Sequence, residues 1–221
     1  MGSIVFSLLS SSCSKDDDAD DDTLAPNTFK DSRDNKIYKT VEIGNQVWMA
    51  ENLKYTGNNG VQEHIPIYTE WVSSNHNGWC YYGNSDGYGS TYGVIYQWEA
   101  AKKACPDGWH LPTIAEWDEL VDYLGEYATS KLAGNATLWK DGILTKNADF
   151  GTSGFSALPC GKRTPHGGQF KDMGEIGWWW TASVDGNSDP YGCNIYYGSQ
   201  SNLSKISSNM GTGFYIRCIK N

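Results

Sequence analysis

Two short apolar runs near residue 40 have the pattern of β-strands. The segments 38–43 and 46–49 are rich in β-branched, aromatic and other large side chains, and Gly44-Asn45 separates them. Two such runs joined by two turn residues are typical of a β-hairpin. Glycine in the first turn position favours a type II′ turn. We therefore predict an N-terminal hairpin over residues 38–49.

Two later segments have a helical pattern instead. The segment 96–104 contains good helix formers and stops before Pro106, which cannot continue a helix. The segment 113–124 begins with Thr113 and Glu116, the spacing of a capping box, and Gly125 follows it in the usual terminal position. Its apolar residues recur at i, i+3, i+4 and i+7, which predicts one buried face. They are Trp117, Leu120, Val121 and Leu124.

The remaining pattern has no helical period. Between the hairpin and the first helix lies a long stretch, 56–91, that is rich in Gly, Asn and Ser and is predicted to be irregular. Strand-like runs return after residue 150, separated by turn residues. They are 155–158, 178–183, 193–197 and 214–219. A hairpin, two helices and then a mostly antiparallel twisted sheet with long loops predict the α+β class.

The first residues have the pattern of a targeting segment. An apolar run, 4–9, leads through small residues to Cys13, as at the end of a lipoprotein signal peptide. The run is too short to span a bilayer, which needs about 20 apolar residues. We interpret residues 1–12 as a signal-peptide remnant and Cys13 as the lipidated residue. The alternative is a buried strand ending in an ordinary cysteine, but six aspartates in the next seven-residue run 16–22 disfavour it.

Charge is concentrated behind that cysteine. The net charge is -9, but Lys15 and the six aspartates of 16–22 account for -5 of it, so the rest of the chain carries -4. Residues 13–28 are therefore expected to form an acidic, self-repelling tether. The sequence Ser-Lys-Asp-Asp-Asp after Cys13 resembles the surface-export signal of Bacteroidetes lipoproteins. The sequence has no stripe of basic residues that could contact the phosphates of a nucleic acid, so nucleic acid is excluded as a partner.

Several stretches coincide with one protein family. In order, they are 38–53 (YKTVEIGNQVWMAENL), 104–113 (ACPDGWHLPT) with Glu116-Trp117, 154–159 (GFSALP), 179–183 (WWTAS) and 213–220 (GFYIRCIK). Together they resemble the Fibrobacter succinogenes major paralogous domain, a module of surface proteins in Bacteroidetes and Fibrobacteres, over residues 29–221. The resemblance implies a relation to the C-type lectin-like fold. The family's biochemical role is poorly defined, so the resemblance identifies the module and leaves its activity open.

The resemblance also bears on the cysteines, which an exported protein carries into an oxidising compartment. Lectin-like domains tie the end of their helical region to the last strand, which implies a Cys105–Cys218 disulfide. Cys160 and Cys193 depart from the family pattern, and a second bridge between them is expected from neighbouring strands. Cys80 is left unpaired. A zinc site is disfavoured because there is no C-x-x-C pair and no histidine at ligand spacing.

Aromatic residues give the candidate ligand site, since the chain has ten Trp and fourteen Tyr. Sugars stack their C–H faces on aromatic rings, while Asn, Asp and Gln bind their hydroxyls. Aromatics in loops or near strand ends are therefore the expected ligand-binding residues, although loops packed on their own aromatics remain an equal alternative. Aromatics of the family stretches, Trp48, Trp109, Trp117 and Trp180, are expected in the core. The loop candidates are Trp71, Trp79, Tyr81, Tyr82, Trp178 and Tyr191, with Tyr197 as a further member.

The chain carries no recognisable catalytic or cofactor motif. Neither H-E-x-x-H nor G-x-S-x-G occurs, His110 is interpreted as structural, and the calcium-dependent sugar motifs of C-type lectins are absent. We therefore expect a non-catalytic lipoprotein without metal or cofactor, lipid-anchored to the outer membrane and facing the cell exterior. Its expected partner is a polysaccharide or another surface ligand. The alternative is a structural or accessory subunit of an outer-membrane complex of the nutrient-uptake type.

Overall fold

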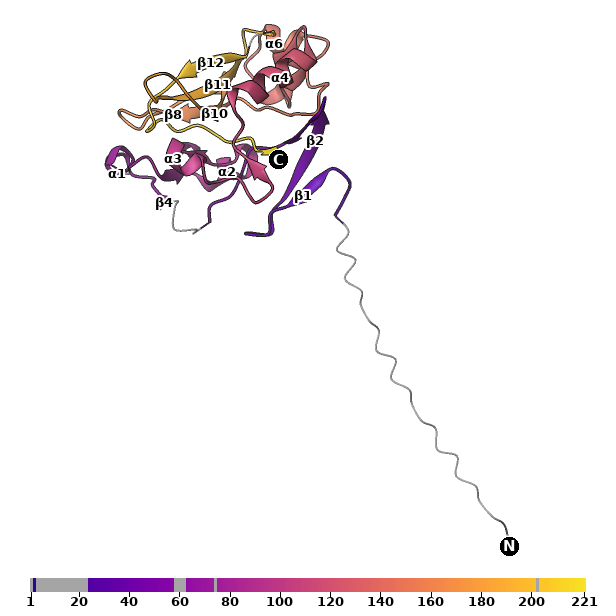
Figure 1. The fold of residues 1–221 in the computed structure, drawn as a ribbon, viewed down its shortest axis with the longest axis horizontal. Coiled ribbons are helices and arrows are strands. Elements are labelled where there is room, and N and C mark those ends of the chain that lie inside the picture. Colours follow the sequence, from indigo (N-terminus) through magenta and orange to yellow (C-terminus); the bar gives the residue numbers. More distant parts are fainter. Residues whose placement is uncertain (1, 3–23, 58–62, 74, 202) are drawn as a thin grey trace.

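The fold is taken from a computed structural model that describes residues 2, 24–57, 63–73, 75–201 and 203–221. Cys13, the interpreted signal-peptide remnant apart from Gly2, and most of the acidic tether lie outside the described residues. Figure 1 shows two layers, with β8, β10, β11 and β12 beside α4 and α6 in one and α1, α2, α3 and β4 in the other.

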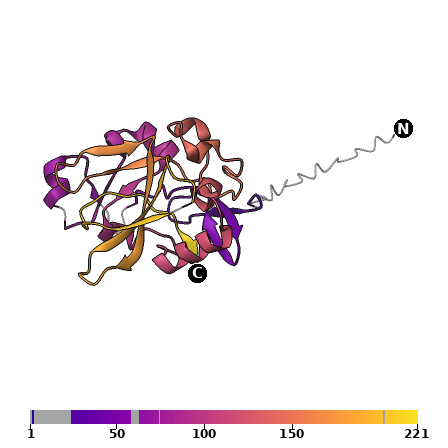
Figure 2. The same cartoon turned by 90° about the horizontal axis from the view of Figure 1, so that it is seen from above.

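The first sheet joins the two ends of the domain. Its strand order is β1 (Thr28–Lys30), β2 (Ile37–Ile43), β3 (Gln46–Met49), β13 (Ile219–Lys220) and β7 (Trp109–His110). The last strand therefore lies directly beside the N-terminal hairpin, and Figure 2 places the C-terminus there too. The predicted hairpin is confirmed: Ile43 pairs with Gln46 across two residues, and Gly44 takes the positive φ of 62° that a type II′ turn requires.

The second sheet carries most of the late strands. Its order is β12 (Ser204–Ser207), β11 (Pro190–Tyr196), β10 (Ile176–Val184), β8 (Cys160–Arg163) and β9 (Phe170–Met173). All its pairings are antiparallel except β8 with β10. The predicted segments 178–183 and 193–197 fall largely in β10 and β11. The segment 155–158 forms no strand, and only the end of 214–219 does, in β13.

The prediction that the stretch 56–91 is irregular is wrong: its described residues form several short elements. These are β4 (Glu63–His64), α1 (Tyr68–Ser73), β5 (Gly78–Cys80), the 3-10 helix η1 (Tyr82–Asn84) and α2 (Asp86–Tyr92). The strands β4 and β5 form a third sheet with β6 (Ile95–Tyr96). Elements this short are not long enough to show a periodic apolar stripe in the sequence. Their stability depends on contacts with distant parts of the chain.

The helices differ in how well the sequence marks them. In α4 (Ile114–Leu124) the capping box is present in full, with Thr113 and Glu116 each bonding the other's backbone N–H. Trp117 and Leu120 are buried on its apolar face. The segment 96–104 gives only the short α3 (Trp98–Ala101), because its beginning belongs to β6. Short helices that the pattern did not predict follow α4: α5 (Ala128–Leu132), η2 (Ala136–Leu138) and α6 (Ile143–Lys146).

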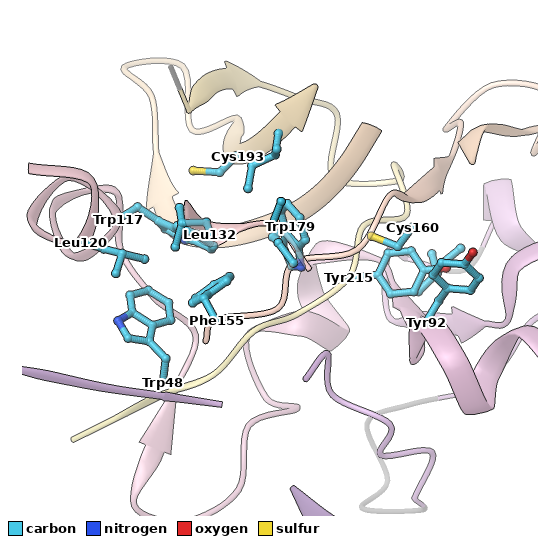
Figure 3. Packing of buried hydrophobic residues seen from close by; sticks show 14 of the residues in the cluster. Trp48, Tyr92, Trp117, Leu120, Leu132, Phe155, Cys160, Trp179, Cys193 and Tyr215 are labelled. Carbon is cyan, nitrogen blue, oxygen red and sulfur yellow. The ribbon is translucent and has the colours of Figure 1, made fainter. Parts of the chain in front are cut away.

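The central strand β10 is buried on both faces, which explains its unbroken apolar run. Side chains alternate between the faces of a strand. Trp179 packs into a cluster with Trp48, Trp117 and Phe155, whereas Trp178 and Trp180 pack on the other side against Phe214. Figure 3 shows the first cluster. The four family-stretch tryptophans expected in the core, Trp48, Trp109, Trp117 and Trp180, are buried.

The cysteines confirm one predicted bridge and contradict the other. Cys105 and Cys218 form a disulfide. Cys160 and Cys193 are free and buried, so the second bridge is wrong. They do not lie on neighbouring strands: β10 runs between β8 and β11, and Trp179 of β10 faces Cys193. Strands are about 4.8 Å apart, so two strand spacings exceed the reach of a disulfide. Trp179 lies between the two cysteines in Figure 3.

Candidate functional site

Trp71 was predicted to bind ligand, and the structure contradicts this. Its side chain on α1 is fully buried, its Nε1 donates to the carbonyl of Gly211 at 2.8 Å, and the guanidinium of Arg163 lies 4.3 Å from its ring centroid. A ring enclosed in this way cannot stack on a sugar from solvent. Trp71 is therefore a core residue, and the stability of the loop depends on it.

Trp79, Tyr81 and Tyr82 occupy the region between β5 and α2. Trp79 is buried: its ring stacks on His64, with centroids 4.4 Å apart, and its edge meets Tyr81. Tyr81 and Tyr82 are half-buried. Burial raises the pKa of the hydroxyls of Tyr81 and Tyr82, with Asp86 adding to the effect at Tyr81 and Asp172 at Tyr82. Of the three, only Tyr82 leads on to a more exposed aromatic surface.

Trp178 lines a hollow, but its side chain is buried. One face stacks on Phe214, with centroids 5.0 Å apart and 11° between the planes. Lys162 Nζ lies 4.0 Å from the centroid of the Trp178 ring, and Trp178 Nε1 donates to Asp172 Oδ2 at 3.0 Å. Tyr191, half-buried on β11, pairs with Ser207 of β12, a residue that lines this hollow of about 280 Å³. The six predicted aromatics thus do not form one site: Trp71 lies in the core, Trp79, Tyr81 and Tyr82 lie together, and Trp178 and Tyr191 lie near another hollow.

A row of aromatics runs from β9 across η1 to α2, half-buried at Phe170 and Tyr82, exposed at Tyr88 and buried at Tyr92. The ring of Phe170 is 5.1 Å from that of Tyr82, Tyr82 is 5.5 Å from Tyr88, and Tyr88 is 6.1 Å from Tyr92. Tyr88 is 42 % exposed. Its ring and that of Tyr92 line an open hollow of about 370 Å³, which we call the Tyr88 groove. The groove residues are Ser85, Gly87, Tyr88, Thr91, Tyr92 and Leu138.

The helix α2 places Tyr88 and Tyr92 on one side, because they are four residues apart. The helix ends at Gly93, whose φ of 86° favours glycine. A Cβ at Gly93 would lie 2.8 Å from the carbonyl oxygen of Leu53, so no larger side chain fits. This close approach fixes the end of α2, and with it Tyr92, against the segment that follows the hairpin.

A second hollow, of about 190 Å³, adjoins the groove, and Thr91 lines both. We call it the polar hollow. Its lining combines two cations, a carboxylate and an amide with small and apolar residues. They are Lys39, Ala50, Glu51, Asn52, Thr91, Ser156, Leu158 and Arg217. Aromatic and polar surfaces therefore meet at Thr91, which is the arrangement that binding of an amphipathic ligand such as a sugar requires.

The floor of the polar hollow joins four of the family-like stretches. Arg217 donates through Nε and Nη2 to Asn52 Oδ1, and through Nη1 to the carbonyls of Met49 and Phe155. Asn52 Oδ1 also accepts from Trp179 Nε1 at 2.8 Å, and its amide donates to the Tyr92 carbonyl. Residues of stretches far apart in sequence thus converge under the junction of the two hollows.

The charges of the polar hollow are unevenly balanced. Burial opposes ionisation of Glu51, but hydrogen bonds from Lys54 Nζ and the Lys39 N–H outweigh it, and the pKa of Glu51 is lowered. Burial lowers the pKa of Arg217 to about 9. Its guanidinium is therefore still protonated at neutral pH. Within the described residues, no carboxylate lies within ion-pair distance of Arg217.

His110 is held as a structural residue. Its Nε2 bonds Glu116 Oε1 and its Nδ1 bonds Asn221 Oδ1, both at 2.7 Å. Because Glu116 Oε2 also completes the capping box with Thr113, His110 fixes the start of α4 and the C-terminus together. Both ring nitrogens are occupied, which supports the structural interpretation.

The free thiols have the environment of inert cysteines. Cys80 and Cys160 are buried, and burial raises the pKa of Cys80 to about 11 and that of Cys160 to about 12, although Arg163 and Arg217 lower them in part. Nucleophilic cysteines depend on the thiolate. At neutral pH these groups are therefore protonated thiols.

Among the described residues, no three or more His, Cys, Asp or Glu side chains gather closely enough to hold a metal ion. In the same residues no helix has the length and apolar character needed to cross a membrane.

Sequence reasoning missed Tyr88 and Tyr92, which line the groove. The available signal was their i, i+4 spacing in 86–92, but the glycines and serines around them suggested a loop. Tyr82 was predicted and belongs to the same aromatic row.

The family model described as the Fibrobacter succinogenes major domain matches residues 41–220, inside the 29–221 expected from the resemblance. Neither the curated proteins nor the solved structures gave a match to the chain.

Proposed function

The chain belongs to the Fibrobacter succinogenes major domain family, and from this premise we propose that it is a non-catalytic surface lipoprotein that binds glycan in the Tyr88 groove. Membership indicates a surface-associated protein whose biochemical role the family leaves undefined. The ligand class is therefore argued from the chemistry of the groove.

The observation that carries the proposal is the exposed ring of Tyr88 in an open groove. Tyr88 is 42 % exposed, and its ring is in edge-on contact with that of Tyr82. Sugar rings present C–H faces that stack on such a platform. Ser85 and Thr91 supply hydroxyls beside it, and Asn52, Glu51 and Lys39 follow in the polar hollow. This combination supports an oligosaccharide longer than one residue.

The cellular setting is part of the same proposal. Cys13 carries lipid, and the acidic segment after it holds the domain at the outer membrane, facing the cell exterior. The support is the sequence pattern around Cys13. We also propose the C-type-lectin-like relation, supported by the order of hairpin, helices and late sheet and by the disulfide from the helical region to the C-terminal segment.

A glycan array probed with the full chain tests the binding proposal. Tyr88→Ala should remove the signal, since the stacking platform is gone. Tyr123→Ala is the matched control, because Tyr123 on α4 is 66 % exposed and lines neither hollow. If both variants keep the parent's glycan profile, the groove is not the binding site. Mass spectrometry of membrane-extracted protein tests the anchor: a diacylated or triacylated Cys13 is expected, and an unmodified chain that keeps residues 1–12 would refute it.

A further inference from the structure

We propose, on the premise that the Tyr88 groove binds glycan, that the polar hollow takes the carboxylate of an acidic sugar such as a uronic acid. The groove alone does not distinguish neutral from acidic glycans, since stacking is insensitive to charge. The distinction comes from the charges around the adjoining hollow.

The cations of the hollow exceed its carboxylates. Glu51 is the carboxylate that lines it, and Lys54 Nζ already pairs with Glu51 Oε2 at 2.8 Å. Lys39 and Arg217 line the hollow too, and among the described residues neither has a carboxylate within ion-pair distance. The chain as a whole has a net charge of -9, so a local excess of positive charge is against the general trend. A bound carboxylate would balance it.

Arg217 supplies a buried charge that has only neutral acceptors. Its side chain is fully buried, and all of its hydrogen-bond acceptors are carbonyl or amide oxygens from Asn52 and three backbone positions. Attraction between charges is stronger where water is excluded, so an anion above this floor is stabilised more than one on the open surface. The weakest of these bonds joins Nη2 to the carbonyl of Ser156 at 3.4 Å. Ser156 also lines the hollow.

The rim is shaped by an unusual backbone. Ser156, which lines the hollow, has a φ of 58°, a conformation that non-glycine residues rarely adopt. The Phe155 and Ser156 carbonyls both face Arg217, so the guanidinium holds this turn in place. Strain of this kind tends to occur at binding sites. Lys39, exposed at the same rim, gives the direct contact for a carboxylate, while Tyr88 stacks a neighbouring sugar through the shared Thr91 boundary.

The test pairs each acidic glycan with its own neutral form. Polygalacturonate, alginate and hyaluronan oligosaccharides are titrated into the full chain before and after chemical reduction of their carboxylates to alcohols. At least one native glycan should bind, and its reduced form should bind about tenfold or more weakly, as for loss of hydrogen bonds to a charged group. Lys39→Gln should weaken the native glycan roughly two- to fivefold at low salt. Lys103→Gln, exposed and outside both hollows, is the matched control.

The outcomes separate this inference from the proposed function. Equal or tighter binding of the reduced forms overturns the acidic-sugar inference and leaves glycan binding intact. The same holds if none of the acidic glycans binds while neutral glycans on the array do. If no glycan of either kind binds, the proposed function fails and this inference fails with it. A Lys39→Gln variant that binds the native glycan like Lys103→Gln would also overturn the assignment to the polar hollow.

Discussion

Asn52 Oδ1 accepts hydrogen bonds from both Nε and Nη2 of Arg217, at 3.3 and 2.9 Å, across 165 residues of sequence. The same oxygen accepts from Trp179 Nε1, and the Asn52 amide donates to the Tyr92 carbonyl. One side chain thus connects the hairpin segment, the central strand, the C-terminal segment and the end of α2. This connection determines where the Tyr88 groove meets the polar hollow.

Replacing Asn52 should destabilise the fold severely. Asn52→Ala removes the acceptor of Arg217 Nε, of one hydrogen bond from Arg217 Nη2 and of the Trp179 N–H, all buried. We expect a loss of about 3 kcal/mol or more in the free energy of unfolding, measured by urea denaturation. Asn187→Ala, in the exposed loop between β10 and β11, should change it by less than about 0.5 kcal/mol. Equal effects of the two substitutions would contradict the role of Asn52.

The Cys105–Cys218 disulfide should contribute strongly to stability, since it closes a loop with a sequence separation of 113. Its loss removes the constraint on the unfolded chain, with an expected cost of about 2–5 kcal/mol. The measurement compares denaturation of the parent with that of the Cys105→Ala, Cys218→Ala double variant, both under oxidising conditions. Cys193→Ala is the control for removal of a thiol without a bridge. Unchanged stability of the double variant would argue against this role.

The buried thiols predict a dependence on alkaline pH. Burial raises the pKa of Cys80 to about 11 in the folded protein, whereas an unfolded thiol ionises near pH 8.5. The unfolded state therefore loses its proton first, so the stabilising contribution is complete below about pH 8.5 and is lost as the pH rises towards 11. Stability should fall less steeply over this range in Cys80→Ala than in the parent. Identical slopes, or rapid alkylation of native Cys80 at pH 8, would refute this environment.

Trp71 should behave as a core residue and not as a ligand contact. Trp71→Ala removes a buried ring, its hydrogen bond to Gly211 and the surface under Arg163, at an expected cost of about 3–5 kcal/mol. Trp71→Phe keeps most of the apolar ring and should fold at a smaller cost. That variant should bind glycans like the parent protein. Loss of binding in a folded Trp71→Phe variant would restore the original interpretation.

The parts of the fold that sequence could predict depend on local signals. The 44–45 turn and the Thr113–Glu116 capping box act over a few residues, so the hairpin and α4 are predicted correctly. Strand order is not local. The expected bridge between Cys160 and Cys193 requires their strands to be neighbours, but β10 pairs between β8 and β11, and no residue near either cysteine signals that order.

The candidate site was only partly predictable for the same reason. The sequence predicts loops over 56–91, where the described residues form short strands and helices, but Tyr82 belongs to the observed row. Whether a ring is exposed depends on distant residues: Trp71 is covered by Arg163, and the Tyr88 groove is lined by Leu138 from another part of the chain. The helix α2 is rich in glycine, which has a low helix propensity, so the sequence does not predict a helix there or the i, i+4 pair of Tyr88 and Tyr92.

The most direct test of the account is a calorimetric titration of the full chain with the glycan that gives the strongest array signal. The parent and Tyr123→Ala should give the same dissociation constant. Tyr88→Ala should weaken binding at least about tenfold, or 1.4 kcal/mol, while its unfolding midpoint stays near that of the parent because Tyr88 is partly exposed. A Tyr88→Ala variant that is folded and binds as tightly as the parent would contradict glycan binding in this groove.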